Sequence, residues 1–197
     1  MESRIQRLEI LRREVENCRK CSLWRTRKSP VFGEGPPDAG IMLVGLGPGK
    51  QEDLQGRPFV GAAGKFLDEL LEEAGLKRNQ LYITNVMKCF LPDNRASDDQ
   101  VKMCSPYLDG QIEVIQPKLI IALGNLAASY LLGKSGLKPE SMEKIHGKIY
   151  DASTLTLTLK IATMYHPASA LRNPGLKDML IEDWRKLGVG LRELKLI

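Results

Sequence analysis

The sequence predicts an α/β protein whose four-stranded parallel sheet is flanked by helices on both faces. Short apolar runs alternate along the chain with segments whose apolar residues recur at helical spacing, as in parallel sheets. The runs contain few polar residues, which indicates strands buried on both faces. The chain has 197 residues, 43% of them hydrophobic and 27% charged, which favours one folded domain over 1–197 and excludes a disordered chain.

The first half of the chain contains two predicted helices and two predicted strands. Residues 2–17 carry apolar side chains at helical spacing and are predicted to form a helix. A loop rich in glycine and proline follows over 29–40, and the apolar run 41–45 is the first predicted strand. A helix is expected over 61–75, where a glycine ends it, and the second strand over 81–86.

The second half continues the alternation and ends in a helix. Its predicted elements are a helix to about 116, a third strand over 119–124, a strand over 154–164 that forms the fourth core strand through a hairpin, and a last helix over 176–187. Ser97 or Asp98 is expected to cap the first of these helices, and Asn125 the helix that follows the third strand.

Polar residues gather where the predicted strands end, and this is the first indication of function. In parallel sheets, ligands bind beyond the carboxyl ends of the strands. The corresponding segments here are 45–49, 85–89, 124–125 and 165–166. We therefore expect the functional site at this edge of the sheet.

The charge of the chain favours an anionic partner. Lys and Arg total 29 against 24 Asp and Glu, which gives a net charge of +5, and nucleic acid is the commonest partner of basic proteins. No apolar run approaches the ~20 residues that span a bilayer, and the N-terminal segment is too charged for a secretory signal. We expect a cytoplasmic protein without a membrane partner.

Four cysteines are spaced as metal ligands are. Cys18 and Cys21 form a Cys-x-x-Cys pair, and Cys89 and Cys104 lie far along the chain. Disulfides are rare in reducing compartments, and four thiolates suit either Zn²⁺ or a [4Fe–4S] cluster. The spacing leaves both metals open, together with four unrelated buried cysteines. A redox role for the pair is disfavoured because no strand precedes it.

The loop over 45–61 is rich in glycine but matches neither common phosphate-binding motif. It lacks the G-x-G-x-x-G pattern and the G-K-[ST] of a P-loop, although its glycines allow a ligand to approach the backbone. Phe59 either anchors this loop on the core or stacks on a planar ligand. His166 follows a strand at the same edge as Asn85, and no G-x-S-x-G accompanies it, so a serine hydrolase is disfavoured.

Taken together, these segments resemble the uracil-DNA glycosylase superfamily, specifically the iron–sulfur family 4 enzymes of thermophilic bacteria and archaea. The resemblance covers most of the chain. Its motifs are Cys18-x-x-Cys21, Gly-Arg-Pro-Phe-Val-Gly over 56–61, Ile-Thr-Asn-Val-x-Lys-Cys over 83–89, Asn94-Arg95, Cys104 and His-Pro-Ala over 166–168. Their order and spacing also agree with the family.

The resemblance implies a DNA repair enzyme with a structural cluster. It implies that a [4Fe–4S] cluster is held by Cys18, Cys21, Cys89 and Cys104 and pins loops near the DNA-binding face. The implied reaction begins when uracil is flipped out of DNA. Hydrolysis of its N-glycosidic bond then leaves an abasic site, the first step of base excision repair. We expect a monomer acting on uracil-containing DNA in the nucleoid.

The resemblance also implies roles for the residues at the predicted site. Phe59 is expected to stack on the flipped base, and Asn85 to match uracil O4 and N3–H with its carboxamide. His166 is expected to stabilise the charge that develops on uracil O2. Glu52 is expected to brace Asn85 and His166, and Gly47 to lie against the substrate.

DNA contacts are expected at the rim of the same site. The implied contacts are the backbone at Gly49 and Asn125 and the side chains of Ser169 and Arg172. Leu171 either wedges into the gap left by the flipped base or packs in the core at the start of a helix.

Departures from the family pattern leave alternatives open. Leu46 stands where the family usually has Glu. Gly47 stands where other branches of the superfamily place the Asp or Asn that orients the attacking water, an acid that family 4 also lacks. Phe90 and Leu91 also replace a common Arg-Pro, and His146 stands where Arg is frequent. The alternatives are a slow or non-catalytic iron–sulfur protein that binds damaged DNA, and a glycosylase that prefers another deaminated base.

Overall fold

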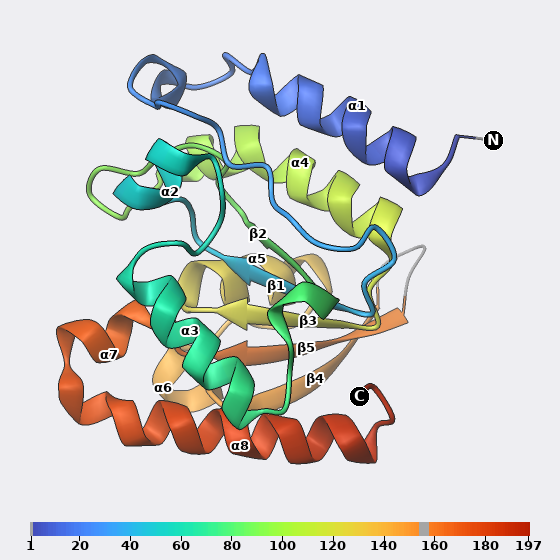
Figure 1. Cartoon of the computed structure of the whole chain (residues 1–197), viewed down its shortest axis with the longest axis vertical. Coiled ribbons are helices and arrows are strands. Elements are labelled where there is room, and N and C mark those ends of the chain that lie inside the picture. The colour runs from blue at the N-terminus through green and yellow to red at the C-terminus, as the bar shows by residue number, and fades with distance from the viewer. Residues whose placement is uncertain (1, 154–157) are drawn as a thin grey trace.

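A central five-stranded sheet organises the chain, as Figure 1 shows for the computed structural model, which describes residues 2–153 and 158–197. The strands are β1 (Ile41–Gly45), β2 (Leu81–Asn85), β3 (Leu119–Leu123), β4 (Lys148–Ser153) and β5 (Thr158–Met164). Their order is β2-β1-β3-β5-β4. The first four in this order run parallel, which confirms the predicted parallel sheet, and β4 pairs antiparallel with β5.

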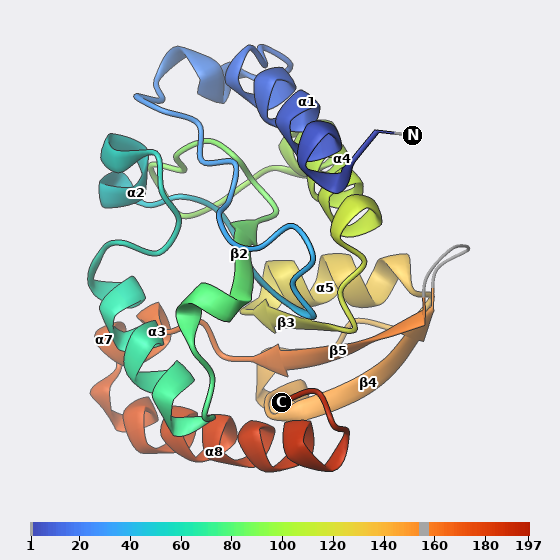
Figure 2. The same cartoon turned by 45° about the vertical axis from the view of Figure 1, so that its right-hand side comes forward.

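Helices cover both faces of the sheet, as predicted, and Figure 2 shows the two layers from a second side. On one face lie α1 (Arg4–Glu16), α4 (Asp98–Ile115) and α5 (Asn125–Lys134), and on the other α3 (Ala62–Glu73) and α8 (Lys177–Glu193). The short helices α2 (Lys50–Gln55), α6 (Met142–Ile145) and α7 (Ala168–Arg172) complete the helical elements discussed below. No helix in 2–153 or 158–197 has the length and apolar content needed to cross a membrane.

The side chains of the strands form a core on each face of the sheet. Every residue of β1 is buried, and alternate side chains point to opposite faces. Met42 and Val44 pack with residues of α1, α4 and α5, whereas Ile41 and Leu43 pack with residues of α3 and α8. Trp184 of α8 is fully buried in the second layer. Burial of each large side chain contributes about 1.5–3 kcal/mol, so both layers stabilise the strand ends where the site lies.

Of the two predicted helix caps, one is confirmed and the other is wrong. Ser97 caps α4 in a capping box with Gln100, as one of the two expected caps. The prediction that Asn125 caps α5 is wrong, because Gly124 takes that position and the Asn125 Oδ1 accepts a hydrogen bond from the backbone N–H of Met142.

Some short elements were not predicted from the sequence, and two predicted elements have different bounds in the structure. The sequence did not predict β4, whose side chains are mostly exposed or half-buried and carry no buried apolar run. Nor did it predict α2, α6 and α7, which are too short for a helical period to be recognised. Of the strand predicted over 154–164, β5 covers Thr158–Met164, and 154–157 lie outside the described residues. The last helix, α8, extends to Glu193, beyond its predicted end.

Candidate active site

A pocket of about 810 Å³ opens at the carboxyl ends of β1, β2, β3 and β5, where the sequence predicted a site. In Figure 1, α2 and α7 lie at this end of the sheet. The pocket brings together nine of the residues predicted to bind substrate or DNA: Gly47, Gly49, Glu52, Phe59, Asn85, Asn125, His166, Ser169 and Arg172. Segments far apart in the sequence therefore converge on one cavity.

Asn85 is the last residue of β2 and forms part of the buried wall of the pocket. It pairs in register with Gly45 of β1, and only 2% of its surface is exposed. Its Oδ1 is buried and has no hydrogen-bond partner within the described part of the chain. A buried acceptor without a donor costs about 1–3 kcal/mol, so this oxygen is arranged for a donor that a ligand supplies.

Gly45 makes room for Asn85 and Phe59. A Cβ at Gly45 would lie 2.5 Å from the Asn85 Oδ1 and 2.7 Å from the Phe59 Cζ, and both distances are far below van der Waals contact. Glycine at the end of β1 therefore allows the carboxamide and the aromatic ring to approach each other.

Phe59 reaches the pocket from the loop between α2 and α3, and its backbone is left-handed, with φ +51°. This conformation is strained for an aromatic residue. The ring is 6% exposed and packs with the second core layer. The ring is therefore anchored on the core, as one of the two interpretations predicted, and it also lines the pocket; its stacking on a planar ligand stays a prediction.

Glu52 of α2 holds the loop that follows Phe59. Its Oε1 accepts hydrogen bonds from the backbone N–H groups of Val60, at 2.9 Å, and Gly61, at 2.8 Å. We expected Glu52 to brace Asn85 and His166. In the described part of the chain, its hydrogen bonds go to the Phe59 loop instead, and the carboxylate acts on the pocket through that loop.

His166 lies beyond β5, and its imidazole is neutral at physiological pH. Burial and the nearby Arg172 charge lower its pKa to about 4, and Glu52 acts in the opposite direction. The backbone N–H of Ala168 donates to His166 Nδ1 at 3.1 Å. Because Nδ1 accepts this bond in the neutral ring, Nε2 carries the proton and is a donor. The ring stacks against Phe59 with centroids 5.7 Å apart.

The residues predicted to contact DNA line this pocket, with one exception. Asn125, Ser169 and Arg172 line it, together with Gly49 at the start of α2. Leu171 does not line the cavity, but it projects from α7 beside it and is 51% exposed. Its exposure excludes the interpretation of Leu171 as a core residue.

Leu46 and Gly47 directly follow β1, and the structure accounts for the glycine at position 47. Leu46 lines the pocket with an apolar side chain. A Cβ at Gly47 would lie 2.8 Å from the Leu91 Cδ1 and 3.1 Å from the Met87 Cβ. Leu91 is itself one of the departures, and its buried side chain occupies the space that a larger residue at position 47 would need.

Sequence reasoning missed part of the pocket wall. The segment 93–96 lines one side, and Leu123, Leu126, Met142 and Tyr165 also contribute. Tyr165 precedes His166 directly, so its position at a strand end was a usable signal. The segment 93–96 follows Pro92 in a polar loop, and its contact with the pocket depends on the path of that loop.

The four cysteines line a second, smaller hollow beside β2. Cys18 and Cys21 reach it from the segment between α1 and the 3-10 helix Ser22–Arg25, Cys89 from beyond β2 and Cys104 from α4. The interpretation as four unrelated buried cysteines is therefore wrong, because all four line one hollow. All four are free thiols. No three His, Cys, Asp or Glu side chains within 2–153 and 158–197 lie close enough to hold a single metal ion.

Two donors face the sulfur atoms of this hollow. Arg27 Nη1 lies 3.2 Å from Cys89 Sγ, and the backbone N–H of Lys88 donates to Cys104 Sγ at 3.2 Å. Hydrogen bonds to sulfur are typical of iron–sulfur sites, where they tune the cluster. Four thiols around one hollow, two of them facing hydrogen-bond donors, are the donor set that an iron–sulfur cluster takes, whereas their separation does not suit a single ion such as Zn²⁺.

Lys88 connects the hollow to the pocket. Its side chain is 1% exposed, and its Nζ donates to Thr84 Oγ1, the Asn85 backbone oxygen and Gln111 Oε1, each at 2.7 Å. Gln111 lies on α4, as does Cys104. The ammonium group of Lys88, which makes three hydrogen bonds, therefore holds the end of β2 in place.

Comparison with known proteins agrees with this geometry. The chain matches the family described as the uracil DNA glycosylase superfamily over residues 32–188. It is similar to type-4 uracil-DNA glycosylases from Sulfurisphaera tokodaii, at 47% identity over 91% of this chain and 83% of the relative, and Saccharolobus solfataricus, at 46% over 91% and 84%. A third, from Archaeoglobus fulgidus, is 40% identical over 93% of both chains.

These matches span nearly the whole chain and include the strand ends that form the pocket. The sequence, the fold and the relatives agree, and the chain belongs to the type-4 family of the uracil-DNA glycosylase superfamily.

Proposed function

We propose that this protein removes uracil from DNA by hydrolysing the N-glycosidic bond, leaving an abasic site for base excision repair. The observation that carries the proposal is the buried Oδ1 of Asn85, which has no hydrogen-bond partner among the described residues and belongs to a residue that lines the same pocket as His166 and Phe59. A uracil within a duplex is out of reach of such a pocket, so the nucleotide must be flipped out at a cost of a few kcal/mol.

Asn85 selects uracil over cytosine. Its Oδ1 accepts from uracil N3–H, and its amide group donates to uracil O4. Cytosine presents an acceptor at N3 and a donor at N4. The Asn85 Oδ1 would therefore face another acceptor, and the Asn85 amide group would face another donor. Leaving buried polar groups unpaired is what gives a hydrogen-bonding site strong discrimination. The anchored ring of Phe59 stacks on the flipped base.

His166 stabilises the leaving group. When the glycosidic bond breaks, its electron pair goes to uracil N1, and the sugar becomes an oxocarbenium-like cation. The negative charge spreads to uracil O2, where the Nε2–H of neutral His166 donates a hydrogen bond. Water adds to the sugar carbon and releases a proton, and the uracil anion takes up a proton. The neutral, pre-oriented imidazole stabilises the charge without having to give up its own proton.

The four cysteines are proposed to hold a [4Fe–4S] cluster. Support comes from the common hollow that they line, from the donors on Cys89 and Cys104, and from membership of the family. When bound, the cluster supplies a structural cross-link between segments that are distant in sequence. Solutions of the protein should then be brown and absorb broadly near about 400 nm.

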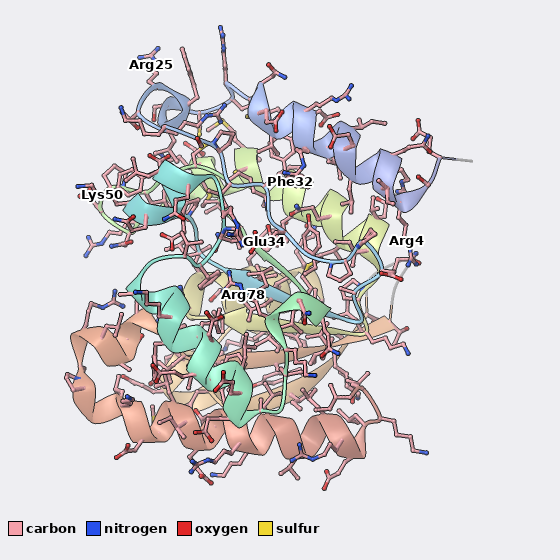
Figure 3. The ribbon with its side chains drawn as sticks, in the orientation of Figure 1. Arg4, Arg25, Phe32, Glu34, Lys50 and Arg78 are labelled. Atoms are coloured by element: carbon pink, nitrogen blue, oxygen red, sulfur yellow. The ribbon has the colours of Figure 1, made fainter. Side chains whose placement is uncertain are left out.

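DNA is proposed to lie across the mouth of the pocket. Gly49 and Asn125 offer backbone groups there, and Ser169 and Arg172 offer side chains. Arg25 and Lys50 lie on the same side of the molecule in Figure 3 and are proposed as further phosphate contacts. We propose that the chain acts as one monomeric domain, in the nucleoid where its substrate lies.

A gel assay on an oligonucleotide with a single uracil tests the proposal. The wild-type protein should release uracil and leave an alkali-labile site, and an identical oligonucleotide with cytosine should remain intact. Because Leu46 lines the pocket in place of the family glutamate, hypoxanthine is included as a second base. Tight binding of uracil-containing DNA without release would favour a damage-binding protein, and Leu46→Glu should then restore release.

A further inference from the structure

A carboxylate and two guanidinium groups lie outside the pocket, behind the Phe59 loop. Arg57 binds Glu34 through Nε at 2.8 Å and through Nη2 at 3.1 Å. Arg78 Nη2 lies 3.5 Å from the same carboxylate. Figure 3 shows Glu34 and Arg78 next to each other near the centre of the molecule. The mechanism proposed above gives these three side chains no role.

Arg78 connects this group to the Phe59 loop. Its Nη2 donates to the backbone oxygen of Pro58 at 2.7 Å, directly before the strained Phe59. Its Nη1 donates to Asp68 of α3 at 3.0 Å. Arg78 thus holds the residue before Phe59, and Glu52 holds the two residues after it. The left-handed backbone of Phe59 persists only because its surroundings fix it on both sides.

The position of Glu34 is fixed by the strand that carries Asn85. Backbone hydrogen bonds of 3.0 and 2.8 Å join Glu34 to Ile83 of β2. Gly33 and Gly35 flank Glu34 with φ +128° and +136°. A Cβ would lie 2.9 Å from the backbone oxygen of Ile83 at the first and 2.1 Å from that of Leu81 at the second, so only glycine allows this close approach.

We propose that Glu34, Arg57 and Arg78 are positioning residues that hold Phe59 at a fixed place relative to Asn85. Backbone hydrogen bonds to β2 hold Glu34 in place. Arg78 contacts the Glu34 carboxylate and donates to the backbone oxygen of Pro58, so it holds the residue before Phe59 relative to β2. Arg78 matters most because it contacts the loop itself, whereas Arg57 is 61% exposed and acts through Glu34. This inference rests on the proposed uracil excision, in which the ring of Phe59 stacks on the base.

A double-mutant cycle tests the inference. Single-turnover excision from a single-uracil duplex is measured for wild type, Arg78→Met, Phe59→Ala and the double variant. Misplacing a positioned group by about 1 Å costs up to about 100-fold, so Arg78→Met should slow excision by about tenfold or more. In the Phe59→Ala background, the same substitution should change the rate less than about twofold, because the group it positions is gone. Arg78→Lys keeps a donor and should recover part of the rate.

Matched controls separate this role from general stability and from DNA binding. Arg185→Met removes a comparable ion pair between α8 and Glu73 of α3, away from the loop, and should leave the rate unchanged. The salt dependence of DNA binding should be the same for Arg78→Met and wild type; a shallower slope would assign Arg78 to a phosphate contact and overturn the inference.

Two further results would also overturn it: a wild-type rate for Arg78→Met, or an equal loss in both backgrounds. Absence of uracil release by the wild-type protein would instead contradict the proposed function.

Discussion

Asn85 and Phe59 reach the same pocket by different structural routes. Asn85 ends a buried strand, and its neighbours in the sheet and Lys88 behind it fix its backbone. Phe59 lies on a loop and has a left-handed backbone. Two side chains hold the adjacent backbone: Glu52 accepts a hydrogen bond from the Val60 N–H, and Arg78 donates to the Pro58 oxygen. In the proposed mechanism, the hydrogen bonds of Asn85 to the base thus depend on the sheet, and the stacking of Phe59 on the base depends on a few polar side chains.

This difference has a consequence for distant substitutions. A strand end within a two-sided core moves only if the core moves. A strained loop held by single hydrogen bonds moves when one of them is lost. We therefore expect the position of Phe59 to respond to changes outside the pocket, and that of Asn85 to be insensitive to them.

The largest effect is expected at Asn85 itself. Asn85→Ala removes the group that selects uracil and orients it, and the single-turnover excision rate should fall by about 100-fold or more. The strand should remain in place, so the melting temperature and DNA affinity should change little. Asn17→Ala, which alters an exposed helix end, serves as the control. A rate near wild type would show that another group recognises the base.

Gly64→Ala tests whether excision depends on the position of the Phe59 loop rather than on the stability of the helix α3. Alanine is normally more stable than glycine inside a helix, by about 0.5–1 kcal/mol. In α3, however, the new Cβ would lie 1.9 Å from the backbone oxygen of Phe59 and must displace the loop. We expect slower excision and lower stability, followed by gel assay and thermal unfolding.

Gly133→Ala is the matched control, because no atom of residues 2–153 or 158–197 lies within 4 Å of a Cβ at this position of α5. This variant should be as stable as wild type or more stable, with an unchanged rate. Normal activity in Gly64→Ala would contradict the claim that the Phe59 loop needs this close packing.

A moderate effect is expected at Glu52. Glu52→Ala leaves the backbone N–H groups of Val60 and Gly61 without their acceptor; both are partly buried, so each costs less than the about 1–3 kcal/mol of a fully buried unsatisfied donor. Excision should slow because the loop is no longer held. Glu52→Gln keeps an acceptor and should lose less. Equal losses in both variants, measured in single-turnover assays, would indicate that the charge rather than the hydrogen bonds matters.

The smallest effect is expected from pH. Burial lowers the pKa of His166 to about 4 from the usual 6.5, so the folded protein keeps the ring neutral while the unfolded chain takes up a proton below about 6.5. His166 therefore destabilises the fold progressively as pH falls from about 6.5 to about 4, but the excision rate should show no His166 titration above about pH 5.

Nitrogen NMR of the imidazole checks this prediction through the tautomer and its titration. The ring should remain neutral with the proton on Nε2 at neutral pH. A titration near 6.5, or a proton on Nδ1, would contradict the assigned role of His166 as a neutral donor.

The sequence predicted the parts of the molecule that depend on local pattern. The buried strands β1, β2 and β3 were recognisable as apolar runs, and strand ends in a parallel sheet define one edge, so Asn85 and His166 were placed together in advance. The antiparallel β4 and the helix α2 lacked such a pattern. The bonding of Glu52 depends on the path of the Phe59 loop, and the ion pairs of Glu34 join residues that no spacing connects.

The most direct measurement is a crystal structure of the protein with a duplex that carries a non-cleavable 2′-fluorinated deoxyuridine. The account predicts a flipped uracil in the pocket, with N3 in hydrogen-bond distance of Asn85 Oδ1, O2 facing His166 Nε2 and the Phe59 ring stacked on the base. A uracil that stays within the duplex, or one held by other side chains while Asn85 Oδ1 remains unpaired, would contradict it.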